Sequence, residues 1–81
     1  MSKGIESKVR EIIGREIKFS GDISKIGLED NLREIGLGSL AFIRAVIAME
    51  IEFGMEFADS DLDVKDFDNF KKIISYIDRK E

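Results

Sequence analysis

Apolar side chains recur at helical spacing in three segments of this chain, and nowhere do they alternate as they would in a strand. Charged residues fill the opposite face of the first and last segments. The apolar positions are Ile5, Val9, Ile12, Ile13 and Ile17, then Leu40, Ile43, Val46, Ile47, Met49, Ile51 and Phe53, and last Phe70, Ile73, Ile74 and Ile77. The pattern predicts an all-α fold, a small bundle of three main helices and one short helix.

Helix-breaking and helix-capping residues set the limits of these segments. Gly54 occupies the position of a left-handed residue after a helix, and Asp68 or Asn69 is placed to cap the last helix. We expect helices near residues 3–18, 39–53 and 69–79, with a short helical turn near 63–67. The stretch that follows the first helix lacks a sustained period and predicts a long loop, pinned by Phe19, Ile23, Ile26 and Leu28.

The length of 81 residues predicts one domain over residues 1–81, because no linker-like stretch divides it. The chain contains neither Cys nor His, which removes thiol nucleophiles, imidazole bases and nearly every zinc site. With so little room for a deep pocket, we expect that the chain is not an enzyme.

The formal net charge of −4 comes entirely from the second half of the chain. Residues 1–40 hold seven basic and seven acidic side chains, whereas residues 41–81 hold six basic and ten acidic ones. This distribution argues against a nucleic-acid partner and favours a positively charged protein partner. No apolar run is long enough to span a membrane and no signal peptide is recognisable, so we expect a cytoplasmic monomer without a membrane partner.

Ser39 stands in Gly36-Leu37-Gly38-Ser39-Leu40, between a glycine-broken turn and a run of helix formers. This context places its hydroxyl at the start of a helix. The oxygen can cap unpaired backbone N–H groups, the role that the pattern alone favours, or it can be an exposed attachment point where the helix N-terminus stabilises a phosphate.

The segment from Asp30 to Leu40, with sequence Asp-Asn-Leu-Arg-Glu-Ile-Gly-Leu-Gly-Ser-Leu, resembles the acyl carrier proteins and peptidyl carrier domains. The likeness continues through Met49-Glu50-Ile51-Glu52-Phe53-Gly54 and the helix at residues 69–77, so it covers most of the chain. Gly-Leu-x-Ser-Leu is a weak motif alone, but it is fairly specific in this helix order and at this length.

The resemblance implies that Ser39 receives 4′-phosphopantetheine from coenzyme A through a phosphodiester, made by a separate phosphopantetheinyl transferase. The arm would carry acyl or aminoacyl groups as thioesters to the transferring and condensing enzymes of fatty-acid, polyketide or peptide biosynthesis. Ser39 would be a tether, because no plausible base lies near it in the sequence. The alternative is a carrier-like interaction module in which Ser39 stays unmodified.

Two features depart from the family pattern. Most carriers have Asp or another polar residue directly before the serine, where it helps to engage the transferase, and this chain has Gly38. The helix after the serine usually presents an acidic outer face, which here is expected to hold Ala41, Arg44, Ala45 and Ala48, with Glu50 and Glu52 toward its end. The likeness is therefore nearer to specialised or peptidyl-type carriers. The predicted partner-docking residues are Leu37, Gly38, Leu40, Ala41, Arg44 and Glu50.

Two further interpretations of this helix stay open. Arg44 is either a partner contact or an intrahelical neighbour that offsets the acidic residues downstream. The apolar positions from Leu40 to Met49 are expected to be mainly core, yet a bundle that parts along this face would admit an acyl chain. The predicted acyl-pocket residues are Ile43, Val46, Ile47 and Met49.

Asp59-x-Asp61-x-Asp63 has the alternating carboxylates that open a calcium loop. An EF-hand loop also needs Gly at its sixth position and Glu at its twelfth, where this chain has Val64 and Phe70. A solvated acidic loop is the better interpretation, and we expect no metal site.

Overall fold

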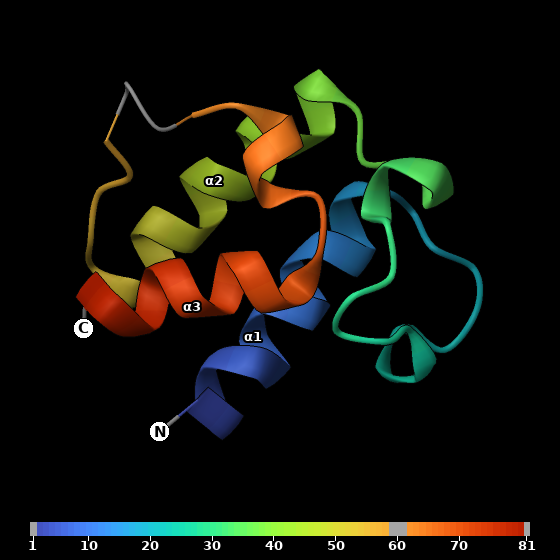
Figure 1. Ribbon diagram of the computed structural model, residues 1–81, viewed down its shortest axis with the longest axis horizontal. Coiled ribbons are helices and arrows are strands. Elements are labelled where there is room, and N and C mark those ends of the chain that lie inside the picture. Colours follow the sequence, from blue (N-terminus) through green and yellow to red (C-terminus); the bar gives the residue numbers. More distant parts are fainter. Residues whose placement is uncertain (1, 59–61, 81) are drawn as a thin grey trace.

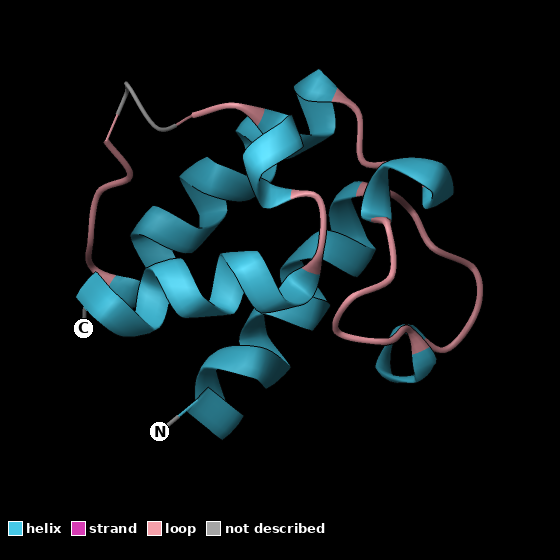
Figure 2. Cartoon of the chain, viewed as in Figure 1, coloured by secondary structure: helices cyan, strands magenta, loops and turns pink. Residues whose placement is uncertain are grey.

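Three α-helices and the loops between them form a bundle in the computed structural model, which describes residues 2–58 and 62–80 (Figure 1). The helices are α1 (Ser2–Glu16), α2 (Ser39–Phe53) and α3 (Phe70–Lys80), and the short 3₁₀ helices are η1 (Ile23–Lys25), η2 (Leu32–Ile35) and η4 (Val64–Phe67). Figure 2 shows helices and loops but no strand in these described ranges. The all-α prediction is confirmed.

Helix α1 packs against both α2 and α3, and the core lies between them. Each helix contributes one buried face, and on α2 that face holds Phe42, Ala45, Val46 and Met49 at positions i, i+3, i+4 and i+7. The predicted ends of α2 are confirmed, since it begins at Ser39 and stops before Gly54, which has the left-handed φ of 62°. Asn69 caps α3 by accepting the backbone N–H of Lys72 at 2.8 Å, as expected.

The predicted inner and outer faces of α2 were partly wrong. Leu40, Ile43 and Ile47, expected in the core, are 65%, 43% and 52% exposed, whereas Ala45, expected outside, is completely buried. The physical reason is that α2 is apolar on nearly all sides, so its periodicity does not identify the buried face. Tertiary contacts select it, and the ring of Phe42 stacks on that of Phe67 in η4 with centroids 5.7 Å apart.

The segment after α2 is held to the bundle by two side chains. The Glu50 carboxylate accepts the backbone N–H of Phe57 at 2.9 Å, and the Tyr76 hydroxyl accepts that of Ala58 at 3.0 Å. Phe57 is buried, and its ring stacks on the Tyr76 ring with centroids 4.7 Å apart. An aromatic cluster of Phe42, Phe57, Phe67 and Tyr76 thus joins α2, the following loop, η4 and α3.

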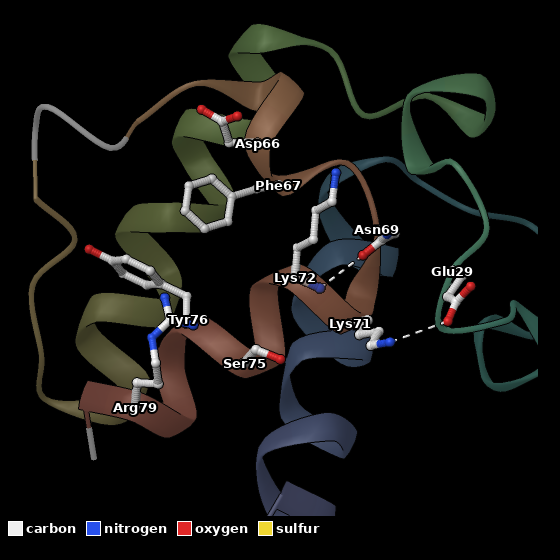
Figure 3. Close-up of a pocket in the computed structure, with 9 residues that line it drawn as sticks. All are labelled: Glu29, Asp66, Phe67, Asn69, Lys71, Lys72, Ser75, Tyr76 and Arg79. Carbon is white, nitrogen blue, oxygen red and sulfur yellow. Dashed lines mark hydrogen bonds and ion pairs between the residues drawn. The ribbon is translucent and has the colours of Figure 1, made fainter.

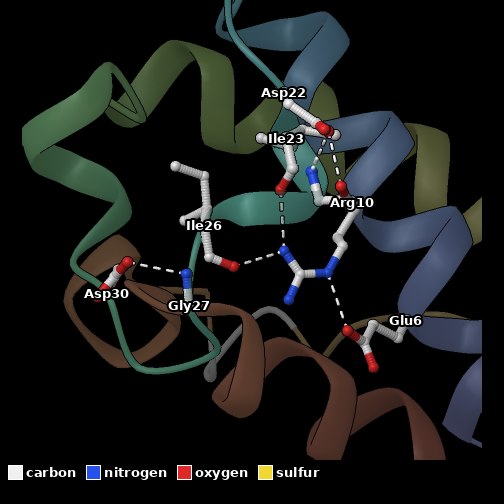
Figure 4. Close-up of polar contacts among 8 residues, drawn as sticks. Glu6, Arg10, Asp22, Ile23, Ile26, Gly27 and Asp30 are labelled. Carbon is white, nitrogen blue, oxygen red and sulfur yellow. Dashed lines mark hydrogen bonds and ion pairs between the residues drawn. The ribbon is translucent and has the colours of Figure 1, made fainter.

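The long connection between α1 and α2, at the right of Figure 1, is anchored by Arg10. Its Nη1 donates to the carbonyls of Ile23 and Ile26 at 2.9 and 2.6 Å, and its Nε donates to Glu6 at 2.9 Å (Figure 4). The guanidinium also lies 4.7 Å from the centre of the Phe70 ring. Arg10 is 9% exposed, so these contacts satisfy a buried charge.

The loop predicted after the first helix was partly wrong, because η1 lies within it, and η2 follows directly after it. Asp22 caps η1, and hydrogen bonds from the Ser24 hydroxyl and the Ser24 N–H lower the pKa of its carboxyl. Ile23 and Ile26 pack on the core as expected, but Leu28 is 40% exposed. Leu28 instead fixes the loop through its carbonyl, which accepts the Lys71 N–H at 3.0 Å.

Of the proposed calcium-loop positions, Asp59 and Asp61 lie outside the described residues. Asp63 caps η4 by accepting the Lys65 N–H at 3.0 Å. Within the described ranges no group of acidic residues is arranged to hold a metal ion. No helix in that part of the chain is both long enough and apolar enough to pass through a membrane.

Candidate functional site

The turn before α2 is held in place by buried and hydrogen-bonded residues on both sides of it. Gly36 has a φ of 120°, which residues with side chains rarely adopt, and it ends η2. Leu37 is fully buried and its N–H donates to the Leu32 carbonyl at 3.0 Å. The Leu37 side chain is thus an anchor that positions the start of α2, and its predicted contact with a partner stays a prediction.

Ser39 is the first residue of α2, and its side chain is exposed. The N-cap position belongs to Gly38, whose carbonyl accepts the Phe42 N–H at 2.9 Å. Among the described residues the Ser39 hydroxyl has no hydrogen-bond partner. The N-cap interpretation of Ser39 was therefore wrong, because the helix begins one residue too early for this side chain to cap it.

The backbone around Ser39 offers unused hydrogen-bond donors. The N–H groups of Ser39, Leu40 and Ala41 precede the first intrahelical bond and have no acceptor within residues 2–58 and 62–80. The first turn of α2 contains no acidic residue that would repel an anion. Free donors and the positive end of the helix dipole together favour a phosphate group on this hydroxyl.

Gly38 has an ordinary extended backbone, with φ −86° and ψ −176°. A Cβ built at this position would meet no other atom within 4 Å. Neither conformation nor space therefore requires glycine here, and the approach to Ser39 is open on this side.

A family model described as the phosphopantetheine attachment site matches residues 7–77. The chain belongs to this family of carrier domains. Members of this family bear a 4′-phosphopantetheine prosthetic group. The match confirms the resemblance to acyl and peptidyl carriers that the sequence indicated. A search of curated proteins found no match.

The residues at the start of α2 fit the prosthetic group of the carrier family. An exposed hydroxyl is available for a phosphodiester, and three neighbouring N–H groups are free to face phosphate oxygens. No carboxylate in the first turn opposes the negative charge.

The other predicted docking residues of the carrier domain differ in their exposure and in whether their charges are paired. Leu40 is 65% exposed and Ala41 is half-buried. Arg44 is exposed and forms no ion pair with the described residues, so it does not offset the acidic residues downstream. Glu50 is half-buried and its carboxylate is engaged by Phe57, which makes it part of the fold rather than a free surface charge.

The four predicted acyl-pocket residues do not share one lining. Val46 and Met49 are buried in the core, whereas Ile43 and Ile47 point to the exposed side of α2. An open cavity of about 740 Å³ lies instead along α3, where Phe67 and Tyr76 line it together with Lys71, Lys72 and Arg79 (Figure 3). None of the four predicted residues lines this cavity.

Proposed function

We propose that residues 1–81 form one carrier domain in which Ser39 bears 4′-phosphopantetheine and which catalyses no reaction itself. The observation that carries this proposal is the exposed Ser39 hydroxyl at the first position of α2, beside unpaired backbone donors, in a chain of the phosphopantetheine-attachment family.

The residues around Ser39 have separate roles in holding the prosthetic group. Ser39 supplies the oxygen that becomes part of the phosphodiester, and the N–H groups of Leu40 and Ala41 stabilise its negative charge. Leu37 and Gly36 fix the turn that holds this oxygen toward solvent. The thiol of the arm supplies thioester chemistry for acyl or aminoacyl groups.

A separate transferase must activate Ser39. The chain has no His or Cys, and the first turn of α2 contains no carboxylate that would take the hydroxyl proton. The Ser39 oxygen would form a bond to the phosphorus next to the pantetheine arm of coenzyme A as the bond from that phosphorus to the nucleotide portion breaks, and the transferase would take the hydroxyl proton. This dependence on coenzyme A is consistent with loading in the cytoplasm.

The proposed partners are the phosphopantetheinyl transferase and the acyl- or aminoacyl-transferring and condensing enzymes of a biosynthetic pathway. Their contacts would centre on Gly38, Leu40, Ala41 and Arg44, which surround or follow Ser39 on the accessible side of α2. Sequestration of an acyl chain by Ile43, Val46, Ile47 and Met49 stays a prediction. It requires the core to open, because Val46 and Met49 are buried. The proposal needs neither nucleic acid nor membrane, and treats the domain as a monomer.

The test is loading in vitro. Incubation with coenzyme A and a broad-specificity phosphopantetheinyl transferase should add one phosphopantetheine group, detected by intact mass, and tandem mass spectrometry should locate it on Ser39. Ser39→Ala should stay unmodified while its circular dichroism remains helical, since the hydroxyl makes no contact that stabilises the described structure. Modification at Ser24, Ser60 or Ser75 instead would refute the assignment.

The second candidate is an interaction module with the same fold and an unmodified Ser39. Gly38 favours it, because the side chain that most carriers present to the transferase at this position is missing. The two candidates differ in one observable property, which is whether Ser39 is modified in the native host.

A further inference from the structure

The open cavity along α3 has no part in the proposed carrier function, since no residue of α2 or of the turn before it lines the cavity. Its volume is about 740 Å³, and two of the residues that line it, Phe67 and Tyr76, are buried aromatic side chains. Ser75 lies between Lys72 and Arg79 along the helix (Figure 3). Because Ser75 is small and the two cationic side chains are long, this face of α3 is hollowed near its middle.

Helix α3 is positively charged in a chain that is negatively charged as a whole. It contains four basic residues and one acidic residue, a net charge of +3, whereas the whole chain has −4 and the residues outside α3 therefore have −7. Three of the four cations, Lys71, Lys72 and Arg79, line the cavity. The charge along α3 is thus opposite to the net charge of the chain, and it favours an anionic ligand.

The stability of α3 does not explain the two lysines. Lys71 and Lys72 are the second and third residues of the helix, where the helix dipole disfavours cations. Their ion pairs, with Glu29 at 3.4 Å and with Asp68 at 3.1 Å, are exposed to solvent and therefore weak. Arg79 lies in the last turn, where the dipole favours a cation, but it forms no ion pair with a described residue.

The spacing of the cations indicates the shape of the ligand. Lys72 and Arg79 are seven residues apart, about 10 Å along the axis of α3, so they do not converge on one small anion. A helix packed alongside α3 has the same separation between two of its own residues that are seven positions apart. Carboxylates at those two positions would face the two cations. Apolar side chains three and four positions after the first carboxylate lie on the same helix face, and they would enter the hollow at Ser75.

Asp66 limits what the ligand can place at one end of the cavity. Its exposed carboxylate lines the cavity and forms no ion pair with a described residue. A second carboxylate close to Asp66 would be repelled, so the ligand should be neutral or basic at that end.

A second copy of this chain does not have the required pattern. None of its three α-helices has two acidic residues seven positions apart. The acidic residues of these helices are Glu6, Glu11 and Glu16 in α1, Glu50 and Glu52 in α2, and Asp78 in α3.

We propose that the cavity along α3 is a docking surface for an acidic amphipathic helix of a partner protein. The partner helix presents carboxylates seven residues apart to Lys72 and Arg79, and apolar side chains between them to the hollow at Ser75. Because the cavity contains no residue of α2, this partner can be bound while Ser39 and α2 stay accessible to other enzymes.

The test uses two synthetic helical peptides, each cross-linked on its far face to hold the helix. One peptide has Glu at two positions seven apart and Leu three and four positions after the first Glu, and the other has Gln in place of both Glu residues. Each is titrated into ¹⁵N-labelled apo protein. The Glu peptide should shift the amide signals of α3 and bind about tenfold more tightly than the Gln peptide, which is the size of two exposed ion pairs together.

Four variants separate charge from shape. Arg79→Gln should weaken binding of the Glu peptide about threefold, and Asp66→Asn should strengthen it about twofold because a repulsive charge is removed. Ser75→Gln fills the hollow without a change of charge and should weaken both peptides about fivefold. Arg15→Gln, which removes an exposed positive charge from α1, is the control and should bind as the original chain does. Unchanged circular dichroism of each variant shows that the fold is intact.

The proposal is overturned if neither peptide binds, if both bind equally, or if the shifted signals lie outside the residues that line the cavity. It is also overturned if a single-stranded oligonucleotide displaces the Glu peptide at equal molar concentration, because a nucleic acid is then the better occupant. These measurements use the apo protein, so they are independent of Ser39 loading. Normal loading without peptide binding would refute only this docking surface, and failure of loading with normal peptide binding would refute only the carrier function.

Discussion

At the scale of single residues, Gly38 directly precedes Ser39 at a position where the backbone does not require glycine. Its φ and ψ are extended and its surroundings are open. As the N-cap residue it leaves the N–H groups of Leu40 and Ala41 unpaired, since it has no side chain. The sequence alone pointed to the unusual glycine, but it placed the cap on Ser39, one residue away.

Gly38→Asp is expected to stabilise the fold and to accelerate loading. A carboxylate at this N-cap can accept a backbone N–H and interacts favourably with the helix dipole, an effect of a few tenths of a kcal/mol up to about 1 kcal/mol. Urea denaturation and the initial rate of modification by a broad-specificity transferase measure the two effects. Gly38→Asn is the control that caps without charge. If Gly38→Asp is at least as stable and is loaded no faster, the missing carboxylate does not limit loading.

Arg10 is a residue whose role the sequence did not reveal, because it appeared among the charged positions of an amphipathic face. The structure buries it and uses it to hold the connection that leads to Ser39. Contacts between residues more than ten positions apart, such as Arg10 with Ile23, leave no periodic signal in the chain.

Arg10→Met is expected to lower the free energy of unfolding by about 2–4 kcal/mol, because it leaves the carbonyls of Ile23 and Ile26 without their donor. Arg15→Met is the matched control, because Arg15 is exposed and its ion pair with Glu11, at 3.9 Å, is weak. This substitution should change the free energy of unfolding by less than about 0.5 kcal/mol. Urea denaturation compares the two. Equal effects of both substitutions would show that Arg10 does not anchor the connection.

At the scale of elements, the ends of α2 were predictable and its orientation was not. Gly54 marks the end by its left-handed conformation, and the change of composition at Ser39 marks the beginning. The buried face is decided by contacts with α1 and η4, which lie far away in the sequence. An amphipathic helix such as α3 has no such ambiguity, and its predicted apolar positions Phe70, Ile73, Ile74 and Ile77 are all buried.

Two substitutions on neighbouring turns of α2 test its orientation. Met49→Ala removes a fully buried side chain and should lower the free energy of unfolding by about 2–5 kcal/mol. Ile51→Lys changes a side chain that is 79% exposed and should alter it by less than about 0.5 kcal/mol. Thermal or urea denaturation distinguishes them, and a large loss of stability in Ile51→Lys would contradict the exposed position of Ile51.

At the scale of the whole molecule, the site around Ser39 lies outside the contacts that hold the small core together. The aromatic cluster and Arg10 tie the connecting loops to the three helices, while Ser39 stands on the surface and takes no part in these contacts. The fold class and the carrier family were accessible from the sequence, because helical spacing and the motif around Ser39 are local features. The exposed face of α2 and the anchoring of the loops were not accessible, because they follow from how distant segments pack.

The modification state of the protein in its native host tests the central claim most directly. Intact mass spectrometry of the chain purified from that host should show the added mass of one phosphopantetheine group, and fragmentation should locate it on Ser39. Unmodified polypeptide mass, obtained while the same protein is helical and the host's other carriers are loaded, would contradict the carrier function and favour the interaction module.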